Sequence, residues 1–337
     1  MMKRLSVTLF FLSFALAVLT LPVYAQVNAQ VYAQVNAAAY PSRPVTLIVP
    51  FAPGASTDIE TRLYARKLAE NTGRAFIADY KPGAGTTIGT AYVAKSAPDG
   101  YTLLSFTSGF AGSAAIYKTL PYDPYKDFSP IALMSNRTVV LVSPATAPFK
   151  NLAEYIAYTR ARPGEINVAT PGLGSGPHLN MAWLHGLLNT RVTYIHYKGS
   201  APANMDLLAG RVHVMATALT ASLANIRAGK LRAFAIGNAL RSPLLPDLQT
   251  VIEQGVPGYD YSSPFGFVGP AGMPPALVSR INAELVKVAK SPDIIKTVEA
   301  DGGMLVTSTP EQLRQKIVKD ITLLKKIVQD TGIALEE

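Results

Sequence analysis

The stretch VTLIVPFAPGASTDIETRL, residues 45–63, joins an apolar run to an amphipathic one through a turn of Pro, Gly and small hydroxyl residues. The run VTLIVPF is short, β-branched and closed by Pro and Gly, which predicts a buried strand. After the turn, apolar residues recur at helical spacing with basic residues between them: Ile59, Leu63 and Leu68. Ser56 or Thr57 can cap the first turn of that helix. The unit is therefore strand, glycine turn, helix.

The same order of strand, small-residue turn and helix recurs along the chain. It is found in residues 75–97, 101–117, 165–188, 192–210 and 212–229. Because strands that alternate with helices form parallel sheets covered by those helices, we expect an α/β protein with mostly parallel sheets.

Two extended segments, residues 138–148 and 259–275, lack a helix directly after their strand and are rich in Pro or Gly. A chain that leaves one sheet, builds a second and returns forms two lobes with a hinge and a cleft. We expect lobe 1 to comprise residues 40–141 and 265–337, with a largely helical end, and lobe 2 to comprise residues 142–264.

The N-terminus has the pattern of a cleavable signal peptide. Lys3 and Arg4 precede an uncharged apolar run over residues 5–21, and PVYA supplies small residues at a cleavage site, so residues 1–25 are predicted to be removed. An uncleaved membrane anchor is the alternative. Residues 26–39 repeat a four-residue AQVN or AQVY unit, which creates further candidate cleavage sites and predicts a disordered segment.

Composition narrows the classes of function. The chain has 337 residues, 49% of them hydrophobic, which excludes a disordered protein and allows a substantial core. It has no cysteine, so it has no disulfide, thiol nucleophile or cysteine metal site. The net charge of +9 comes from scattered basic residues, which argues against a nucleic-acid surface and favours small anionic ligands.

The glycine turns are the best candidates for a site. Ligands of open α/β sheets bind beyond the carboxyl ends of strands, where helix N-termini present unpaired N–H groups. Gly54 and Gly85 would let the backbone approach an anion, and Ser56, Thr57 and Thr86 add hydroxyl donors. Ordinary caps and tight turns are the alternative, but repetition of the pattern favours a carboxylate site.

Other chemistries fit less well. The segment GAGTTIG lacks the spacing of a dinucleotide fingerprint. It is not followed by the Gly-Lys-Ser/Thr that a phosphate-binding loop needs. Ser175 and His178 in GLGSGPHL could indicate a carboxylester hydrolase, but the residues that flank Ser175 do not form a nucleophile elbow. Ser175 and His178 are better suited to donate hydrogen bonds to an anion than to form a catalytic triad. The histidines, including His185, have no carboxylate at metal-binding spacing, so we expect no metal and no cofactor.

Two further residues are candidates for a pocket. Arg137 stands immediately before a predicted apolar strand, near the first lobe crossing, and is either a solvated charge or a partner for a ligand carboxylate. Phe110 lies beside Ser108 in the SGFAG loop after another strand and is either a core residue or an aromatic wall of the pocket.

From about residue 40 to its end, the chain resembles the periplasmic solute receptors of tripartite tricarboxylate transport, the TctC or Bug family. The resemblance is carried by RPVTLIVPFAPGASTD, KPGAGTTIGTAYVAKSAPDGYTLL, LPYDPYKDFSPIAL, HYKGSAPANMDLLAGRVHVM, AGKLRAFAIGNALRSPLLPDLQTVIEQGVPGYD and GFVGPAGMPPALVSRIN. It implies a two-lobed Venus-flytrap fold of the type II kind, no enzymatic activity, a periplasmic location, a monomer and a two-component membrane permease as partner.

The resemblance also implies which residues bind the ligand. In the family the first two glycine turns hold one ligand carboxylate, partly through waters, and loops of the second lobe close over it. Carried over, the first lobe contributes Ala55, Ser56, Thr57, Asp58, Ala84, Gly85 and Thr86. The second lobe contributes Ser175, His178, Lys198, Gly199 and Ser200.

The chain departs from the family pattern at three of its candidate positions. Ala55 and Thr86 stand where relatives often have glycine, and Thr217 stands where an acidic residue is usual. Loss of that acidic group argues against an amino-acid ligand. Together with Phe110 and Arg137 it suggests an aromatic dicarboxylate resembling terephthalate. A short aliphatic dicarboxylate or citrate is the alternative ligand, and sensing for a signalling partner is the alternative to transport.

Overall fold

The computed structural model describes residues 39–54, 56–197, 199–300, 302–333 and 335. The predicted signal peptide, residues 1–25, and all but the last residue of the predicted low-complexity segment, 26–39, lie outside these ranges. Within them, every helix is too short or too polar to cross a membrane.

The first sheet has six strands in the order β11-β4-β10-β3-β1-β2. Its members are β1 (Val45–Val49), β2 (Phe76–Tyr80), β3 (Thr102–Thr107), β4 (Phe128–Arg137), β10 (Ser263–Pro270) and β11 (Met304–Leu305). Strand β1 pairs in parallel with both β2 and β3, whereas β10 runs antiparallel between β3 and β4.

The second sheet repeats this plan with five strands in the order β7-β6-β8-β5-β9. They are β5 (Val139–Pro144), β6 (Asn167–Thr170), β7 (Thr193–His196), β8 (Val214–Ala218) and β9 (Leu231–Ile236). Strand β6 is parallel to β7 and β8, and β5 is antiparallel to β8 and β9.

The predicted α/β fold with two sheets is confirmed, but the sheets are mixed. In each sheet, one strand begins where the chain arrives from the other sheet, and it runs antiparallel to both of its neighbours. This strand is β10 in the first sheet and β5 in the second. The reason is that no crossover helix lies between β4 and β5, so the chain enters the second sheet directly from the first. The sequence pattern of alternating strands and helices does not reveal such an inserted strand.

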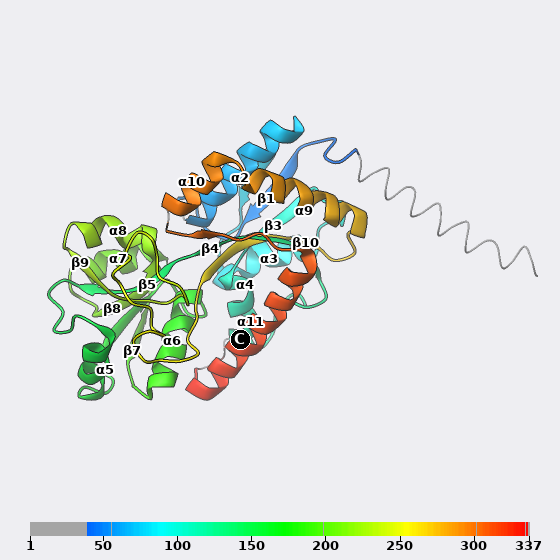
Figure 1. Cartoon of the computed structure of the whole chain (residues 1–337). Helices are drawn as coiled ribbons and strands as arrows, with labels where there is room; N and C mark the ends of the chain where they lie inside the picture. Colours follow the sequence, from blue (N-terminus) through cyan, green and yellow to red (C-terminus); the bar gives the residue numbers. More distant parts are fainter. Residues whose placement is uncertain (1–38, 55, 198, 301, 334, 336–337) are drawn as a thin grey trace, which may run out of the picture.

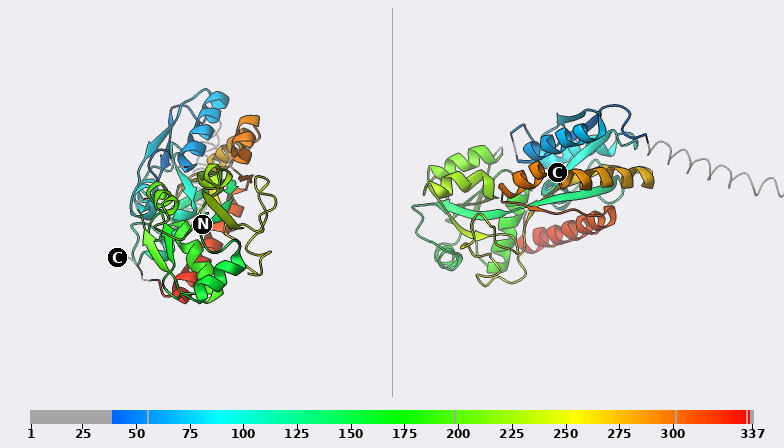
Figure 2. Two further views of the ribbon diagram at one scale, coloured as in Figure 1. Left: turned by 90° about the vertical axis from the view of Figure 1, so that its left-hand side faces the viewer. Right: turned by 45° about the horizontal axis from the view of Figure 1, so that its top comes forward.

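Helices cover both faces of each sheet (Figures 1 and 2). On the first sheet, one face packs against α2 (Ser56–Thr72), α9 (Pro275–Ala289) and α10 (Pro292–Ala300). Its other face packs against α3 (Thr87–Ala94), α4 (Ser108–Ile116) and α11 (Pro310–Thr331). The second sheet lies between α5 (Leu152–Arg160) and α6 (Gly176–Leu188) on one side and α7 (Ser200–Leu208) and α8 (Leu219–Arg227) on the other.

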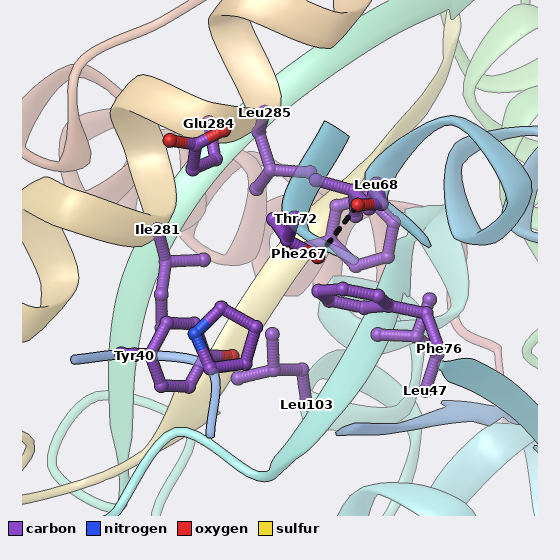
Figure 3. A pocket seen from close by; sticks show the side chains of 11 residues that line it. Tyr40, Leu47, Leu68, Thr72, Phe76, Leu103, Phe267, Ile281, Glu284 and Leu285 are labelled. Atoms are coloured by element: carbon purple, nitrogen blue, oxygen red, sulfur yellow. Dashed lines mark hydrogen bonds between the residues drawn. The ribbon is translucent and has the colours of Figure 1, made fainter. Parts of the chain in front are cut away.

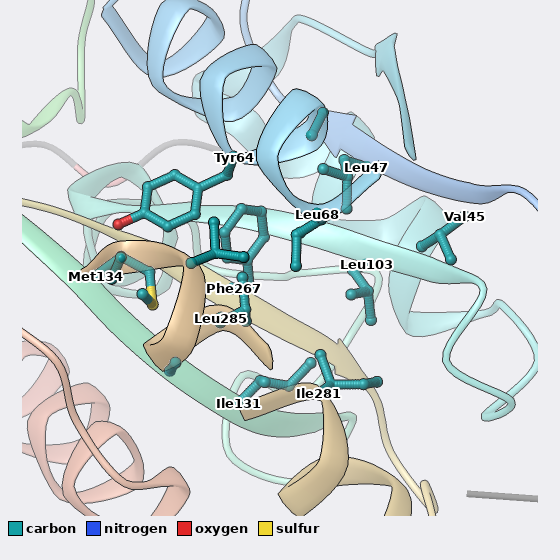
Figure 4. Close-up of a cluster of buried hydrophobic side chains, with 14 of the residues drawn as sticks. Val45, Leu47, Tyr64, Leu68, Leu103, Ile131, Met134, Phe267, Ile281 and Leu285 are labelled. Atoms are coloured by element: carbon teal, nitrogen blue, oxygen red, sulfur yellow. The ribbon is translucent and has the colours of Figure 1, made fainter. Parts of the chain in front are cut away.

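The core beneath α2 and α9 contains a small apolar cavity (Figure 3). Its volume is about 10 Å³, room for about one water molecule, and Tyr40, Leu103 and Ile281 are among the side chains around it. The surrounding cluster, in which Tyr64 and Leu68 of α2 pack on the sheet, is shown in Figure 4. This cavity is part of the core and is too small for a carboxylate ligand.

The chain passes from the first sheet to the second at Thr138. There the side chain of Asn238 holds the strand by two hydrogen bonds, accepting the N–H of Val139 at 2.8 Å and donating to the carbonyl of Arg137 at 3.2 Å. The predicted lobe boundaries, 141/142 and 264/265, fall within β5 and β10. The division into two lobes stays a prediction. Helix α11, which packs on α4 and β4, also contacts α6.

Candidate functional site

The first glycine turn joins β1 to α2, and a buried carboxylate holds it in shape. Gly54 has a positive φ of 87°, and its N–H donates to Oδ2 of Asp58 at 2.8 Å. Oδ1 of Asp58 accepts the hydroxyl of Tyr80 at 2.8 Å and lies 3.0 Å from Nε of Arg62. Both Asp58 oxygens are therefore bonded within the protein, although Asp58 was predicted to contact the ligand.

The second glycine turn joins β2 to α3 through a short 3₁₀ turn with unusual backbone angles. Ala84, Gly85 and Thr86 have φ values of 42°, 61° and 89°, and for a β-branched residue such as Thr86 this conformation is strained. The carbonyl of Gly85 accepts the hydroxyl of Ser113 at 2.6 Å, which anchors the turn to α4. The Thr86 hydroxyl is buried and makes no hydrogen bond to the described residues.

The two turns lie side by side because β1 and β2 are parallel neighbours, with Val49 opposite Tyr80. A third helix N-terminus joins them after β3, where Thr107 Oγ1 accepts the N–H of Gly109 at 3.3 Å. Ser108 is half-buried there. Three helix N-termini at one sheet edge give a region that favours an anion.

This edge faces the loop before α6 of the second sheet. A Cβ on Gly112 of α4 would lie only 2.5 Å from the carbonyl oxygen of Gly174. Similarly, a Cβ on Gly176 would collide with the hydroxyls of Ser108 and Tyr261. The carboxyl edges of the two sheets therefore meet at these glycines.

In the loop before α6, Ser175 and His178 make hydrogen bonds to neighbouring residues of the same loop. Ser175 caps α6, since its Oγ accepts the N–H of His178 at 3.4 Å and donates to the carbonyl of Gly172 at 2.6 Å. Nδ1 of His178 accepts the N–H of Gly174 at 3.2 Å. Burial, followed by the charge of His196, lowers the pKa of His178 to about 3, so its ring is neutral near pH 7.

The remaining predicted residues of the second lobe lie near the start of α7 and in β8. Gly199 has a φ of 113° and donates its N–H to the carbonyl of Pro171 at 2.9 Å, and Ser200 is exposed at the first position of α7. Thr217 is buried in β8 opposite Val140. Lys198, Ala55 and the side chain of Ser56 lie outside the described part of the chain.

Comparison with known proteins identifies the family of the chain. Residues 61–333 match the family described as the tripartite tricarboxylate transporter family receptor. The chain belongs to this family. The receptor is 36% identical over 299 residues to protein BugT of Bordetella pertussis, covering 88% of this chain and 92% of BugT.

Two solved structures from Rhodopseudomonas palustris extend the likeness to three dimensions. Rpa4515 with adipate is 34% identical, with a TM-score of 0.81 over 88% of the receptor and 100% of that chain. MatC (Rpa3494) with bound malate is 30% identical, with a TM-score of 0.78 over 86% of the receptor and 100% of that chain. The receptor has the fold of periplasmic binding proteins and, as a member of a solute-binding family, is not an enzyme.

Phe110 of the receptor is a core residue. Its side chain is 2% exposed, and its ring centroid lies 4.9 Å from that of Phe128, 5.5 Å from that of Phe106 and 6.4 Å from that of Tyr122. The prediction of an aromatic pocket wall is therefore wrong, because these rings come together only when β3, α4 and β4 pack.

Arg137 of the receptor is likewise engaged within the protein. Its Nε and Nη2 donate to Oε2 of Glu60 at 2.9 and 2.6 Å, and the hydroxyl of Ser135 donates to Oε1. Arg137 and Glu60 are only 5% and 6% exposed. The predicted pairing with a ligand carboxylate is corrected, since a carboxylate of α2 occupies that position.

Sequence reasoning missed the contact between Asp58 and Tyr80. One signal was present: an Asp four residues after Gly54 lies at a spacing that allows its carboxylate to accept a turn N–H. The contribution of Tyr80 has no such local signal, because Tyr80 is 22 residues away.

Proposed function

We propose that the receptor captures a small dicarboxylate between the facing edges of its two sheets and delivers it to a two-component membrane permease of the tripartite tricarboxylate type. The observation that carries this proposal is the pair of adjacent glycine turns at one sheet edge. They combine helix N-termini with the buried hydroxyl of Thr86, which has no partner among the described residues. A carboxylate is the anion whose size and charge suit such backbone donors.

The proposed contacts on the first lobe are Thr57, Gly85, Thr86 and Ser108, with Ala84 at the rim. On the second lobe the proposed contact is Ser200, and Gly199 is left out because its N–H is bonded to the carbonyl of Pro171. Ala55, Ser56 and Lys198, outside the described part, stay in the proposal through the family resemblance. We leave out Asp58, Phe110, Arg137, Ser175, His178 and Thr217, since each is bonded or packed elsewhere.

An aliphatic ligand is now favoured over terephthalate. The aromatic choice depended on Phe110 and Arg137, and the structure places the first in the core and the second in an ion pair with Glu60. The relatives solved with adipate and malate were bound to aliphatic dicarboxylates.

The test is a thermal-shift and calorimetry panel of adipate, malate, citrate and terephthalate on the receptor without its N-terminal 38 residues. A ligand at a hundredfold excess over its Kd stabilises the folded state by about 2.7 kcal/mol. We expect an aliphatic dicarboxylate to give this effect. A panel without any shift would refute the proposal, and binding of terephthalate alone would restore the aromatic choice.

A matched pair of variants tests the location. Thr86→Val removes the buried hydroxyl without changing the side-chain shape, and losing one hydrogen bond to a charged ligand costs about 1.5–3 kcal/mol, roughly 10- to 150-fold in Kd. Thr72→Val is the control, because Thr72 donates to Leu68 within α2 at 2.7 Å, beside the core cavity. Equal affinities for the two variants would remove Thr86 from the site.

A further inference from the structure

We propose that Asp58 is a positioning residue that locks the two glycine turns into one shape and does not itself contact the ligand. The inference rests on the proposed function for the identity of the site. It assigns to Asp58 a task different from the ligand contact that the family resemblance implies.

The surroundings of the Asp58 carboxylate show why it is unsuited to a ligand contact. Asp58 is 1% exposed, and its oxygens receive donors from three directions: the N–H of Gly54, the hydroxyl of Tyr80 and Nε of Arg62. A carboxylate ligand offers no further donor to it and would be repelled by its charge. The three donors offset that charge before an anion arrives.

The positions of the donors show what the carboxylate holds together. Gly54 belongs to the first turn, whereas Tyr80 is the last residue of β2 and directly precedes the second turn. The backbone ladder between β1 and β2 ends with the pair of Val49 and Tyr80 and the N–H of Lys81. Beyond that point, one buried carboxylate bonds the first turn to the residue from which the second turn starts.

A fixed shape is needed because the second turn is strained. Ala84 and Thr86 hold left-handed backbone angles that persist only where the surroundings determine them. Ser113 anchors this turn from α4, and the bond between Tyr80 and Asp58 anchors its start from α2. Preorganised donors bind an anion more tightly than donors that must first be ordered.

Two substitutions separate this task from simple stability. Asp58→Asn keeps the side-chain shape but removes the charge, and its NH₂ must face another donor, either the N–H of Gly54 or Nε of Arg62. Tyr80→Phe removes only the hydroxyl. Tyr40→Phe is the control: its hydroxyl donates to the carbonyl of Gly100 at 2.7 Å in the same lobe, where β3 begins rather than where it ends.

The first readout needs no ligand. Hydrogen–deuterium exchange of peptides covering residues 51–57 and 81–87 should become at least tenfold faster in both segments for Asp58→Asn and for Tyr80→Phe, and stay unchanged for Tyr40→Phe. If Asp58→Asn leaves residues 81–87 unaffected, or Tyr80→Phe leaves residues 51–57 unaffected, the proposed link between the turns is wrong.

The second readout is the Kd of adipate, measured by calorimetry at a temperature at which each variant is fully folded. We expect a rise of about tenfold for each of the two variants and a rise in the double variant no larger than that in Asp58→Asn, because the Tyr80 hydroxyl acts only through Asp58. Wild-type affinity in Tyr80→Phe would overturn the positioning role. If the unaltered receptor binds no carboxylate, the proposed function fails, while the exchange experiment still decides whether Asp58 links the turns.

Discussion

The buried pair of Glu60 and Arg137 gives the sharpest prediction for stability. Both side chains are almost completely shielded from water and share two hydrogen bonds, at 2.6 and 2.9 Å. Arg137→Met would remove the cation and leave a buried carboxylate. Breaking a buried pair in this way costs about 3–5 kcal/mol. At roughly 2–4 °C per kcal/mol, we expect the Tm to fall by about 6–20 °C.

The double variant Glu60→Leu with Arg137→Met shows whether the cost comes from the orphaned charge. Replacing a whole buried pair by apolar residues is often neutral. We therefore expect the Tm of the double variant to lie closer to the wild-type Tm than the Tm of either single variant does. Thermal and urea unfolding measure the stabilities, and calorimetry measures adipate binding. The reasoning fails if Arg137→Met costs less than about 1 kcal/mol, or if it abolishes binding while stability is unchanged.

Three further outcomes follow from the same structure. Phe110→Ala should lower the free energy of unfolding by about 3–5 kcal/mol with an unchanged Kd for adipate, and a change in Kd alone would return Phe110 to the pocket. Gly112→Ala places a methyl group against the carbonyl of Gly174, and about 1–3 kcal/mol of overpacking should raise the Kd of adipate by about 5- to 150-fold. X-ray scattering should show a larger radius of gyration for this variant. An unchanged Kd would argue against this contact in the bound form. Burial lowers the pKa of both His178 and His185 to about 3, below the unfolded value of about 6.5. As the pH falls, the unfolded chain therefore takes up protons before the folded one does. The free energy of unfolding should be lower at pH 5 than at pH 7 by about 2 kcal/mol per histidine. Urea unfolding of the wild type and of His185→Phe at pH 5 and pH 7 measures this loss. Equal midpoints of the wild type at the two pH values would contradict it.

The strands and the glycine turns could be predicted because their signals are local. A β-branched run closed by Pro and Gly needs no partner to be identified, and the same holds for the turn after residue 80. The orientation of α2 was harder. Ile59 is 44% exposed, whereas Thr61 lies in the core and shares a hydrogen bond of 2.8 Å with Ser105. A buried face that contains hydrogen-bonded hydroxyls cannot be found from apolar spacing.

The choice of ligand-binding side chains failed for a different reason. Whether Arg137 meets a ligand or a protein carboxylate depends on Glu60, which is 77 residues away and reaches it only when α2 packs on the sheet. Phe110 likewise meets Phe128 only through the packing of α4 against the sheet. The family pattern indicated which loops form the site, but the partners of single side chains depend on tertiary contacts.

The inserted strand β10 has a consequence for how the chain reaches its native state. It lies between β3 and β4, yet it is made only after the whole second sheet has been synthesised. A nascent chain that ends before residue 263 therefore lacks the strand that joins β3 to β4, so one edge of β3 and both edges of β4 are unpaired. The first sheet is completed late, through contacts that span more than 120 residues, and such a strand order favours slow folding with unpaired strands exposed during synthesis.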